Sequence, residues 1–455
     1  MAPSEPRPSP FVVPLVIPSS VHARVVLSIR WTRAPIVQRK KGTAFVVASA
    51  TLVLLFTGCT DAPPPDGPPT GRPALSFGAP LRLPDALCRS FFCFEPSVAV
   101  DGAGRILVTA AQEAAIAVSD DEGRTFRLVD RPGAVRPGAD YMADALLVAG
   151  HDTTVFYLGL VGVGLDMRAL GSPHASVLGI QVAATTDGGT TWDSNVLLSL
   201  EENAQGADRP WLVDGPDGVV VSYSQTRAHE VRVAWSSDGG RTFSPGASVP
   251  VGPRVEVGAA GPIVAAGTEG AARYALALAE RPTPMNAPSL RVYMGGGPAP
   301  DLTPDPAAPG TSAAAAYWPA ATATPEGAWA LAWRDGDSAL WLSQRADGWS
   351  EPVAVAEEAV LAPWIGATGG SVDVAWYAPA ATGGASLWFG RLGTAADSKP
   401  IERVQLADDV RLGTGRSTDF AHAAYLPDGR AVVAWSREGA AFVAVEDRNG
   451  PVGLT

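Results

Sequence analysis

Carboxylates, arginines and aromatic residues recur where the apolar, strand-like runs of this chain begin. Asp208, Arg209 and Trp211 open one such run, and Asp140 and Tyr141 open another. Aromatic faces stack on the C–H surface of a sugar, and charged groups bind its hydroxyls or an acidic substituent. Further candidates of the same kinds, near the ends of other runs, are Trp318, Trp364, Arg334 and Tyr377. The pattern predicts a site for a glycan or a protein ligand.

Two uses of this site remain open. If it is catalytic, one of Asp140 and Asp208 is the acid of a glycoside hydrolysis. Arg209 then holds an anionic group, and Tyr377 acts as the nucleophile or orients one. If the site only binds, the same groups donate and accept hydrogen bonds. Packing inside the protein explains the three tryptophans equally well, because each of them begins a buried strand.

Three octapeptides indicate which elements position these residues. They are SDDEGRTF from Ser119, TTDGGTTW from Thr185 and SSDGGRTF from Ser236. A carboxylate accepts hydrogen bonds from turn amides, glycine takes positive φ, and the closing aromatic residue packs under a sheet. Each octapeptide follows an apolar run, so the repeat predicts the tips of hairpins in an all-β protein. Its aspartates and glycines are Asp121, Gly123, Asp187, Gly189, Asp238 and Gly240.

The octapeptides resemble the Asp-box, or BNR, repeat of the sialidase-like β-propellers. The resemblance implies a propeller in which each box lies on the turn between the third and fourth strands of a blade. It also implies that the boxes lie away from the active site and serve the structure.

Residues 74–450 repeat a phrase of apolar strands separated by Asp/Gly turns, which predicts a single propeller of four-stranded blades. Seven copies can be recognised, and the weakness of the fourth leaves six blades as the alternative. The last copy stops after three strands. LSFGAPLRLP, from Leu75, resembles a strand that follows a box, and we expect this N-terminal strand to complete the last blade.

Chain direction sorts the loops of such a propeller onto two faces. The turns between strands one and two and between strands three and four, boxes included, share one face. The loops between strands two and three and the connections between blades share the other face, which rims the central depression. The candidate ligand residues fall in this second set, together with Glu95, Asp144 and Phe420, so we expect all of them opposite the boxes.

The enzymes of the sialidase family use three arginines, a Tyr–Glu nucleophile pair and an aspartic acid/base. Their first arginine comes from an early Phe/Tyr-Arg-Ile-Pro motif. The nearest sequence here is Phe94-Glu95-Pro96, which has a carboxylate at the arginine position. This difference from the family motif favours a non-catalytic protein that binds its glycan or protein ligand at the central mouth. The alternative is an exo-glycosidase with a non-standard active site, and neither requires a cofactor.

Residues 1–58 have the features of a targeting segment. Arg39, Lys40 and Lys41 precede an apolar run over 44–56 that is too short to span a membrane. The run leads to Phe-Thr-Gly-Cys59, which is similar to the bacterial lipobox; a buried cysteine in a strand is the other interpretation. Residues 59–73 form a Pro/Gly-rich tether. We therefore expect a monomeric lipoprotein, anchored by lipid at Cys59 to a bacterial envelope membrane and facing outside the cytoplasm.

Charge and cysteine content exclude other classes. The net charge of −12 repels phosphate backbones, so nucleic-acid binding is not expected. Cys88 and Cys93 enclose four residues, and in an exported protein we expect a disulfide here, with two buried thiols as the alternative. No CxxC pair occurs and the five histidines are scattered, so no metal site is expected.

Overall fold

The computed structural model of the chain is almost entirely β-structure, and its described residues all lie in one compact unit, Pro68–Thr455. The predicted targeting segment, the tether and Cys59 lie outside the described residues. None of the described residues forms a helix long and apolar enough to cross a membrane. The structure describes residues 75–88, 93–110, 115–135, 138–163, 176–198, 207–225, 230–250, 260–265, 273–280, 289–297, 302–309, 316–325, 327–345, 348–361, 363–381, 383–393, 401–410 and 420–447.

The strands form seven four-stranded antiparallel sheets, the blades of a β-propeller. The first four blades each use consecutive strands. Blade 1 contains β2 (Ser97–Val100), β3 (Ile106–Thr109), β4 (Ala115–Ser119) and β5 (Arg127–Asp130). Blade 2 contains β6 (Asp140–Ala149), β7 (Val155–Val163), β8 (Ser176–Thr185) and β9 (Ser194–Leu198). Blade 3 contains β10 (Ala207–Gly215), β11 (Gly218–Gln225), β12 (Glu230–Ser236) and β13 (Ser244–Pro250). Blade 4 contains β14 (Ala260–Ala265), β15 (Tyr274–Glu280), β16 (Ser289–Gly295) and β17 (Thr303–Pro304).

The remaining blades include the one that closes the ring. Blade 5 contains β18 (Ala316–Ala323), β19 (Trp329–Asp335), β20 (Leu340–Arg345) and β21 (Val353–Ala356). Blade 6 contains β22 (Trp364–Thr368), β23 (Ser371–Pro379), β24 (Ala385–Gly393) and β25 (Glu402–Val410). Blade 7 contains β26 (His422–Tyr425), β27 (Ala431–Arg437), β28 (Ala440–Val445) and, from the N-terminal side, β1 (Leu81–Arg82).

Both predictions about the ring are therefore confirmed, since there are seven blades and an N-terminal strand completes the last one. In β1, Leu81 pairs with Val443 and Arg82 with Phe442. The segment ahead of β1 continues along the same edge, because the Gly78 amide donates to the Val445 carbonyl oxygen at 3.0 Å. A one-turn 3-10 helix, η1 (Asp85–Leu87), then leads from β1 towards β2.

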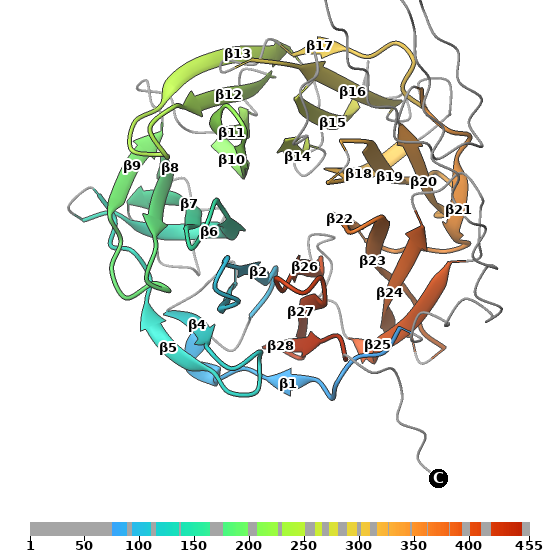
Figure 1. Cartoon of the computed structure of the whole chain (residues 1–455), viewed down its shortest axis with the longest axis horizontal. Coiled ribbons are helices and arrows are strands. Elements are labelled where there is room, and N and C mark those ends of the chain that lie inside the picture. Colours follow the sequence, from blue (N-terminus) through green and yellow to red (C-terminus); the bar gives the residue numbers. More distant parts are fainter. Residues whose placement is uncertain are drawn as a thin grey trace, which may run out of the picture. The chain divides into compact units, whose positions relative to one another are not determined.

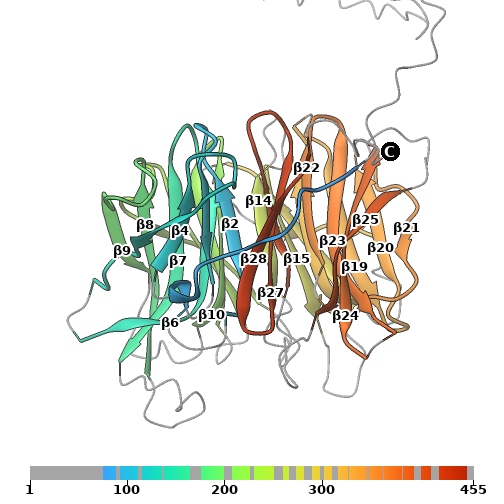
Figure 2. The ribbon, with the colours of Figure 1, turned by 90° about the horizontal axis from the view of Figure 1, so that it is seen from below.

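The first strand of every blade lies at the centre of the ring and the fourth lies at its periphery (Figure 1). Each inner strand contacts the inner strand of the next blade, and β26 contacts β2 to close the circle. Figure 2 shows the blades side by side, with the N-terminal segment crossing the outside of blade 7. Seven inner strands therefore begin around one central axis.

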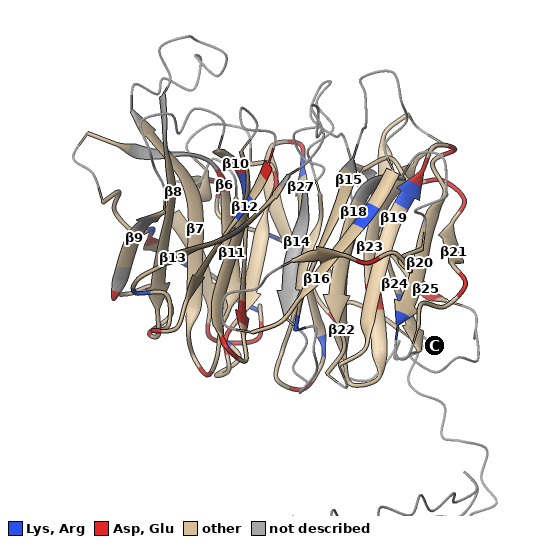
Figure 3. Ribbon diagram, turned by 90° about the horizontal axis from the view of Figure 1, so that it is seen from above, with Lys and Arg blue, Asp and Glu red and all other residues tan. Residues whose placement is uncertain are grey.

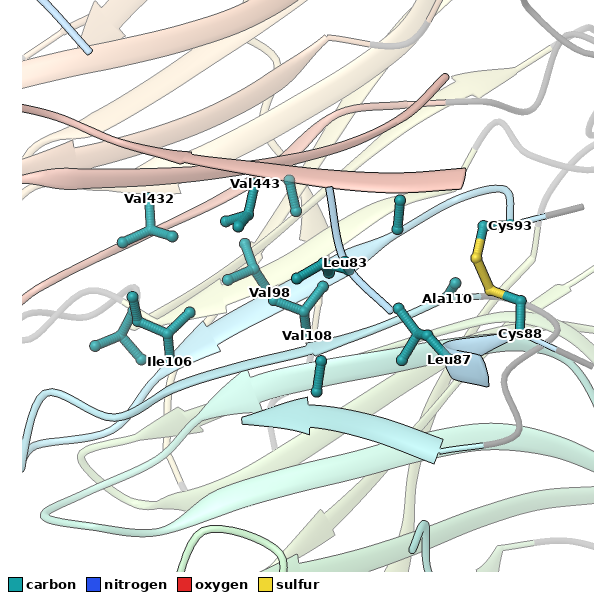
Figure 4. Close-up of a cluster of buried hydrophobic side chains, with 14 of the residues drawn as sticks. Leu83, Leu87, Cys88, Cys93, Val98, Ile106, Val108, Ala110, Val432 and Val443 are labelled. Atoms are coloured by element: carbon teal, nitrogen blue, oxygen red, sulfur yellow. A yellow bond between two sulfur atoms is a disulfide. The ribbon is translucent and has the colours of Figure 1, made fainter. Parts of the chain in front are cut away.

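The core is divided among the interfaces between neighbouring blades, because each sheet is buried on both faces. The described residues form seven apolar clusters of this kind. Figure 4 shows the cluster between blades 7 and 1, which contains Leu83, Leu87, Val98 and Val443. A disulfide joins Cys88 and Cys93 at the edge of this cluster, with 5.6 Å between the Cα atoms.

The three octapeptides form the same turn in blades 1, 2 and 3. In the third of them, Ser236 Oγ donates to Asp238 Oδ1 at 2.7 Å, and the Thr242 amide donates to the same oxygen at 2.9 Å. Thr242 Oγ1 donates to Asp238 Oδ2 at 2.6 Å. Asp121 and Asp187 accept the equivalent hydrogen bonds. The fifth residue has φ between 80° and 83°, a conformation that favours glycine; these residues are Gly123, Gly189 and Gly240.

The substitution Asp238→Ala is expected to lower the free energy of unfolding by roughly 1–3 kcal/mol, because turn groups that now have a partner would lose it. Chemical denaturation measures this loss. Asp120→Ala is the matched control, since the exposed Asp120 carboxylate only reaches Arg127 at 3.3 Å, and it should change stability little. An unchanged stability of the Asp238→Ala protein would contradict the role of this carboxylate in the turn.

Candidate functional site

Near the start of three inner strands, a charged residue lies in the left-handed backbone region. Glu95 (φ 49°) precedes β2, Asp144 (φ 55°) lies in β6, and Arg209 (φ 51°) lies in β10. The strand pairing is interrupted at two of these places, between Ala143 and Leu146 and between Asp208 and Trp211. Positive φ is unfavourable for residues with a Cβ atom, and such strain concentrates at functional sites. Blades 1, 2 and 3 therefore deviate from regular strand geometry at equivalent positions.

These irregularities bring four charged side chains together. Arg209 Nη2 donates to Glu95 Oε1 at 3.0 Å, and both side chains are largely buried, with exposed fractions of 12% and 4%. The Arg209 amide lies 3.1 Å from both Asp144 Oδ2 and Asp208 Oδ1. We call Glu95, Asp144, Asp208 and Arg209 the axial cluster. It joins three blades at the centre of the ring.

The axial cluster changes the acidity of its members. Burial, followed by the charge of Asp144 and a hydrogen bond with the Asp144 side chain, raises the pKa of Asp208 to about 8. Burial also opposes the charge of the Arg209 guanidinium. The neighbouring carboxylates, Glu95 first, outweigh this effect and raise the pKa of Arg209. At neutral pH Asp208 therefore carries a proton and donates a hydrogen bond, beside an arginine that stays charged.

A small cavity of about 20 Å³ adjoins the cluster, enough for one water molecule. Its aromatic wall is Trp211 of blade 3 and Phe420, which precedes β26 of blade 7, with ring centroids 6.2 Å apart. Two blades separate these rings, so their contact spans the centre of the propeller. The Trp211 indole Nε1 is buried and has no hydrogen-bond partner within the described part of the chain. The remaining lining residues are Glu95, Asp144, Ala145, Leu146, Arg209 and Pro210.

The axial cluster lies on the face opposite the octapeptide turns. Blade 3 shows this clearly, because Asp208 is at the start of β10, whereas the turn of Asp238 follows the end of β12. In an antiparallel sheet the ends of the first and third strands share one edge, and the start of the first strand is at the other. Figure 3 shows that charged residues gather mainly near the strand ends, at both faces, while the strand bodies carry few.

The structure brings three of the predicted site residues together, Asp208, Arg209 and Trp211. Asp140 and Tyr141 lie at the start of β6 and Trp318 lies in β18, where only the backbone is described. The carboxylate that β6 contributes to the axial cluster is that of Asp144.

The other predicted residues are in structural positions. Tyr377 lies inside β23 and is fully buried in the cluster between blades 6 and 7, which does not suit a nucleophile. Trp364 packs against His422 and Tyr425 of blade 7, with centroids 6.3 and 6.1 Å apart. Arg334 lies in β19 and donates to the carbonyl oxygens of Ala359 and Val360.

Sequence reasoning placed Glu95, Asp144 and Phe420 on the rim but did not choose them as site residues. One sequence signal was present, since Glu95-Pro96 and Arg209-Pro210 occupy the same place in blades 1 and 3. A charged residue just before a proline, at the start of an inner strand, is expensive to bury without a partner. The positive φ of these residues has no sequence signature.

The variant Asp208→Asn is expected to change the pH dependence of stability. The Asp208 pKa is about 8 in the folded protein, against about 3.9 in an unfolded chain. Because the folded protein holds this proton more tightly than the unfolded chain, the proton stabilises the fold. The stabilisation is complete below about pH 4 and decreases as the pH rises from about 4 to about 8. Asparagine does not ionise, so we expect the variant's free energy of unfolding at pH 9 to exceed that of the wild type by on the order of 5 kcal/mol. Melting curves from pH 4 to 9 test this, and parallel profiles for the two proteins would contradict it.

Comparison with known proteins adds little beyond the fold. No protein-family model and no curated protein matches the chain. A protein of unknown function from Dyadobacter fermentans aligns with 13% identity over 83% of this chain and 100% of that chain, at a TM-score of 0.48. Virginiamycin B lyase from Staphylococcus aureus aligns with 14% identity over 82% of this chain and 99% of that chain, at a TM-score of 0.47. An α-L-arabinanase from Penicillium chrysogenum aligns with 14% identity over 74% of this chain and 100% of that chain, at a TM-score of 0.44. The resemblance to the Asp-box propellers therefore rests on the three octapeptides.

Proposed function

We propose that this protein binds a glycan, free or carried by a protein, at the central mouth of a sialidase-like propeller. The observation that carries the proposal is the axial cluster. Three successive blades each contribute a strained, charged residue to one largely buried group. Well-packed apolar residues would often stabilise a fold as well as a buried ion pair does, so fold stability alone explains the cluster poorly. Recognition of a polar ligand gives a reason for the burial of these charges.

The chemistry of the cluster suits a sugar. The Asp144 carboxylate lines the cavity and can accept hydrogen bonds from sugar hydroxyl groups, and the Arg209 guanidinium beside it donates them. The Trp211 ring offers an apolar face for the C–H side of a sugar, and its indole N–H has no acceptor among the described residues. A small number of precisely oriented polar groups beside aromatic side chains is typical of small-ligand sites.

Glycoside hydrolysis is the second candidate, and the raised pKa of Asp208 is the observation that favours it. An acid that keeps its proton near pH 7 is what protonation of a leaving group requires. The two carboxyl groups of a glycosidase stand about 5–10 Å apart, whereas Asp208 and Asp144 hydrogen-bond to each other. Glu95 would have to serve as the second carboxylate, and it is held by Arg209. Binding without turnover is therefore the better-supported function.

A printed array of glycans, probed with the wild type and with Trp211→Ala, tests the proposal. The wild type is expected to bind a defined subset of glycans, and Trp211→Ala to weaken that binding at least about tenfold. Val353→Ala, at an exposed position on an outer strand, is the control that should bind normally. Absence of binding to every glycan would refute the proposal. Release of free sugar by the wild type, abolished in Asp208→Asn, would establish the hydrolase instead.

We also propose that the propeller is a surface lipoprotein held by a lipid on Cys59. The basic cluster, the short apolar run and the small residues before the cysteine support this. Mass spectrometry of the protein extracted from membranes is expected to show a diacylglyceryl group at a mature N-terminal Cys59. A soluble mature protein that begins elsewhere and is unchanged by Cys59→Ser would contradict the assignment.

A further inference from the structure

The balance of charge in the axial cluster restricts the ligand. Three carboxyl groups contact Arg209, the single basic residue of the cluster: Glu95 accepts from its guanidinium, and Asp144 and Asp208 accept from its backbone amide. The guanidinium is already paired with Glu95 at 3.0 Å. Even with a proton on Asp208, carboxylates outnumber the guanidinium. The pocket beside the cluster therefore has an excess of negative charge.

No second arginine corrects this excess within the described part of the pocket, where Arg209 is the one basic lining residue. Arg334, which the sequence suggested as a ligand-binding residue, donates to two backbone carbonyl oxygens in the connection between blades 5 and 6. Arg391 lies in β24 and is held by Asp373 and Glu446 at 2.8 and 2.7 Å. Recognition of a sugar carboxylate normally relies on such a guanidinium, because its two N–H groups match the two oxygens.

The Trp211 indole N–H in the pocket can donate to any oxygen acceptor, so the surrounding charges decide between neutral and acidic ligand groups. The Trp211 Nε1 atom is buried without a partner among the described residues, on a ring that packs against Phe420. A neutral hydroxyl or acetamido oxygen satisfies one N–H, and a protonated amine is attracted to the aromatic face and to carboxylates. The donors and charges together suit a sugar that carries hydroxyl, acetamido or amino groups.

We propose that the central mouth above the axial cluster selects sugars without an acidic substituent, neutral or amino sugars, and rejects sugar acids such as sialic and uronic acids. This inference rests on the proposed glycan binding. A sugar carboxylate would be brought close to at least two carboxylates in a poorly hydrated site, where like charges repel more strongly than in water. Discrimination of this kind comes from repulsion of the wrong ligand as well as from attraction of the right one.

Calorimetric titration of the full chain with two matched sugar sets tests this selectivity. The first set is glucose, glucosamine and glucuronic acid, and the second is lactose and sialyllactose. We expect the acidic member of each set to bind at least about tenfold more weakly than its neutral counterpart. Glu95→Gln removes one carboxylate and frees Arg209. It should therefore reduce the ratio between the dissociation constants of the acidic and the neutral sugar about tenfold. Asp144→Asn serves the same purpose if Glu95→Gln fails to fold.

The matched control is Asp120→Asn, which makes the same change of charge at an exposed site in the turn between β4 and β5, on the opposite face. It should leave the selectivity as in the wild type. Equal or tighter binding of the acidic sugars overturns this inference and leaves glycan binding intact. An unchanged ratio in a folded Glu95→Gln or Asp144→Asn protein also overturns it. Binding of no sugar at all, together with an empty glycan array, overturns the proposed function and this inference with it.

Discussion

The variant Arg209→Met is expected to lower the free energy of unfolding by about 3–5 kcal/mol, as measured by chemical denaturation. Glu95 is only 4% exposed and is ion-paired with Arg209, so the substitution leaves a buried carboxylate without its counter-ion. The amide of residue 209 remains, and with it the hydrogen bonds to Asp144 and Asp208. The loss therefore reports on the guanidinium itself.

The double variant Glu95→Gln/Arg209→Met separates this effect from general disruption. Removal of both charges also removes the uncompensated carboxylate, so most of the lost stability should return. Arg127→Met is the matched control, because Arg127 and Asp120 are an exposed pair at 3.3 Å, and it should cost less than about 1 kcal/mol. A double variant as unstable as Arg209→Met alone would show that Glu95 does not depend on this arginine.

A chain that begins at Pro84, and so lacks β1, is expected to lose on the order of 5 kcal/mol of stability and to aggregate. The deletion removes Leu75 and Leu83, which are 9% and 3% exposed, and the ring contact of Phe77 with Phe389 at 5.2 Å. Burial of a large apolar side chain contributes about 1.5–3 kcal/mol. The deletion also leaves β28 as an open edge that can pair with another chain.

Thermal melting and size-exclusion chromatography measure both effects of this deletion. A chain that begins at Ala74 keeps the whole closing segment and is the control, expected to melt like the full chain and to remain monomeric. If the chain from Pro84 is equally stable and monomeric, closure by the N-terminal strand contributes little to the fold. The Cys88–Cys93 disulfide is retained in both proteins, so it does not affect the comparison.

The fold was largely predictable because its signals are local and repeated. The octapeptides at Ser119, Thr185 and Ser236 each require one turn geometry, and the seven apolar repeats favoured the seven blades that the structure has over the alternative of six. The short last copy implied a missing strand, which β1 provides. The exact extent of that strand was not predictable, because the segment from Leu75 pairs continuously only at Leu81–Arg82.

The site was predictable only in part, because its contacts join different blades. Asp208 and Arg209 stood out as charges at the start of an inner strand, where burial demands a partner. The partner on β6 is Asp144, and the interrupted pairing between Ala143 and Leu146 that positions it has no sequence signature. Tyr377 was predicted in a loop, but β23 extends to Pro379, so the strand carries this ring into the core.

The most direct test of ligand binding at the axial cluster is the NMR signal of the Trp211 indole N–H. Titration of the ¹⁵N-labelled protein with lactose, N-acetylglucosamine and glucosamine is followed in the indole region, and Trp211→Phe assigns the resonance. The account predicts that a sugar that binds shifts the Trp211 resonance more than any other indole signal, because this N–H, which has no partner within the described ranges, gains an acceptor. A bound sugar that leaves the Trp211 signal in place would contradict it.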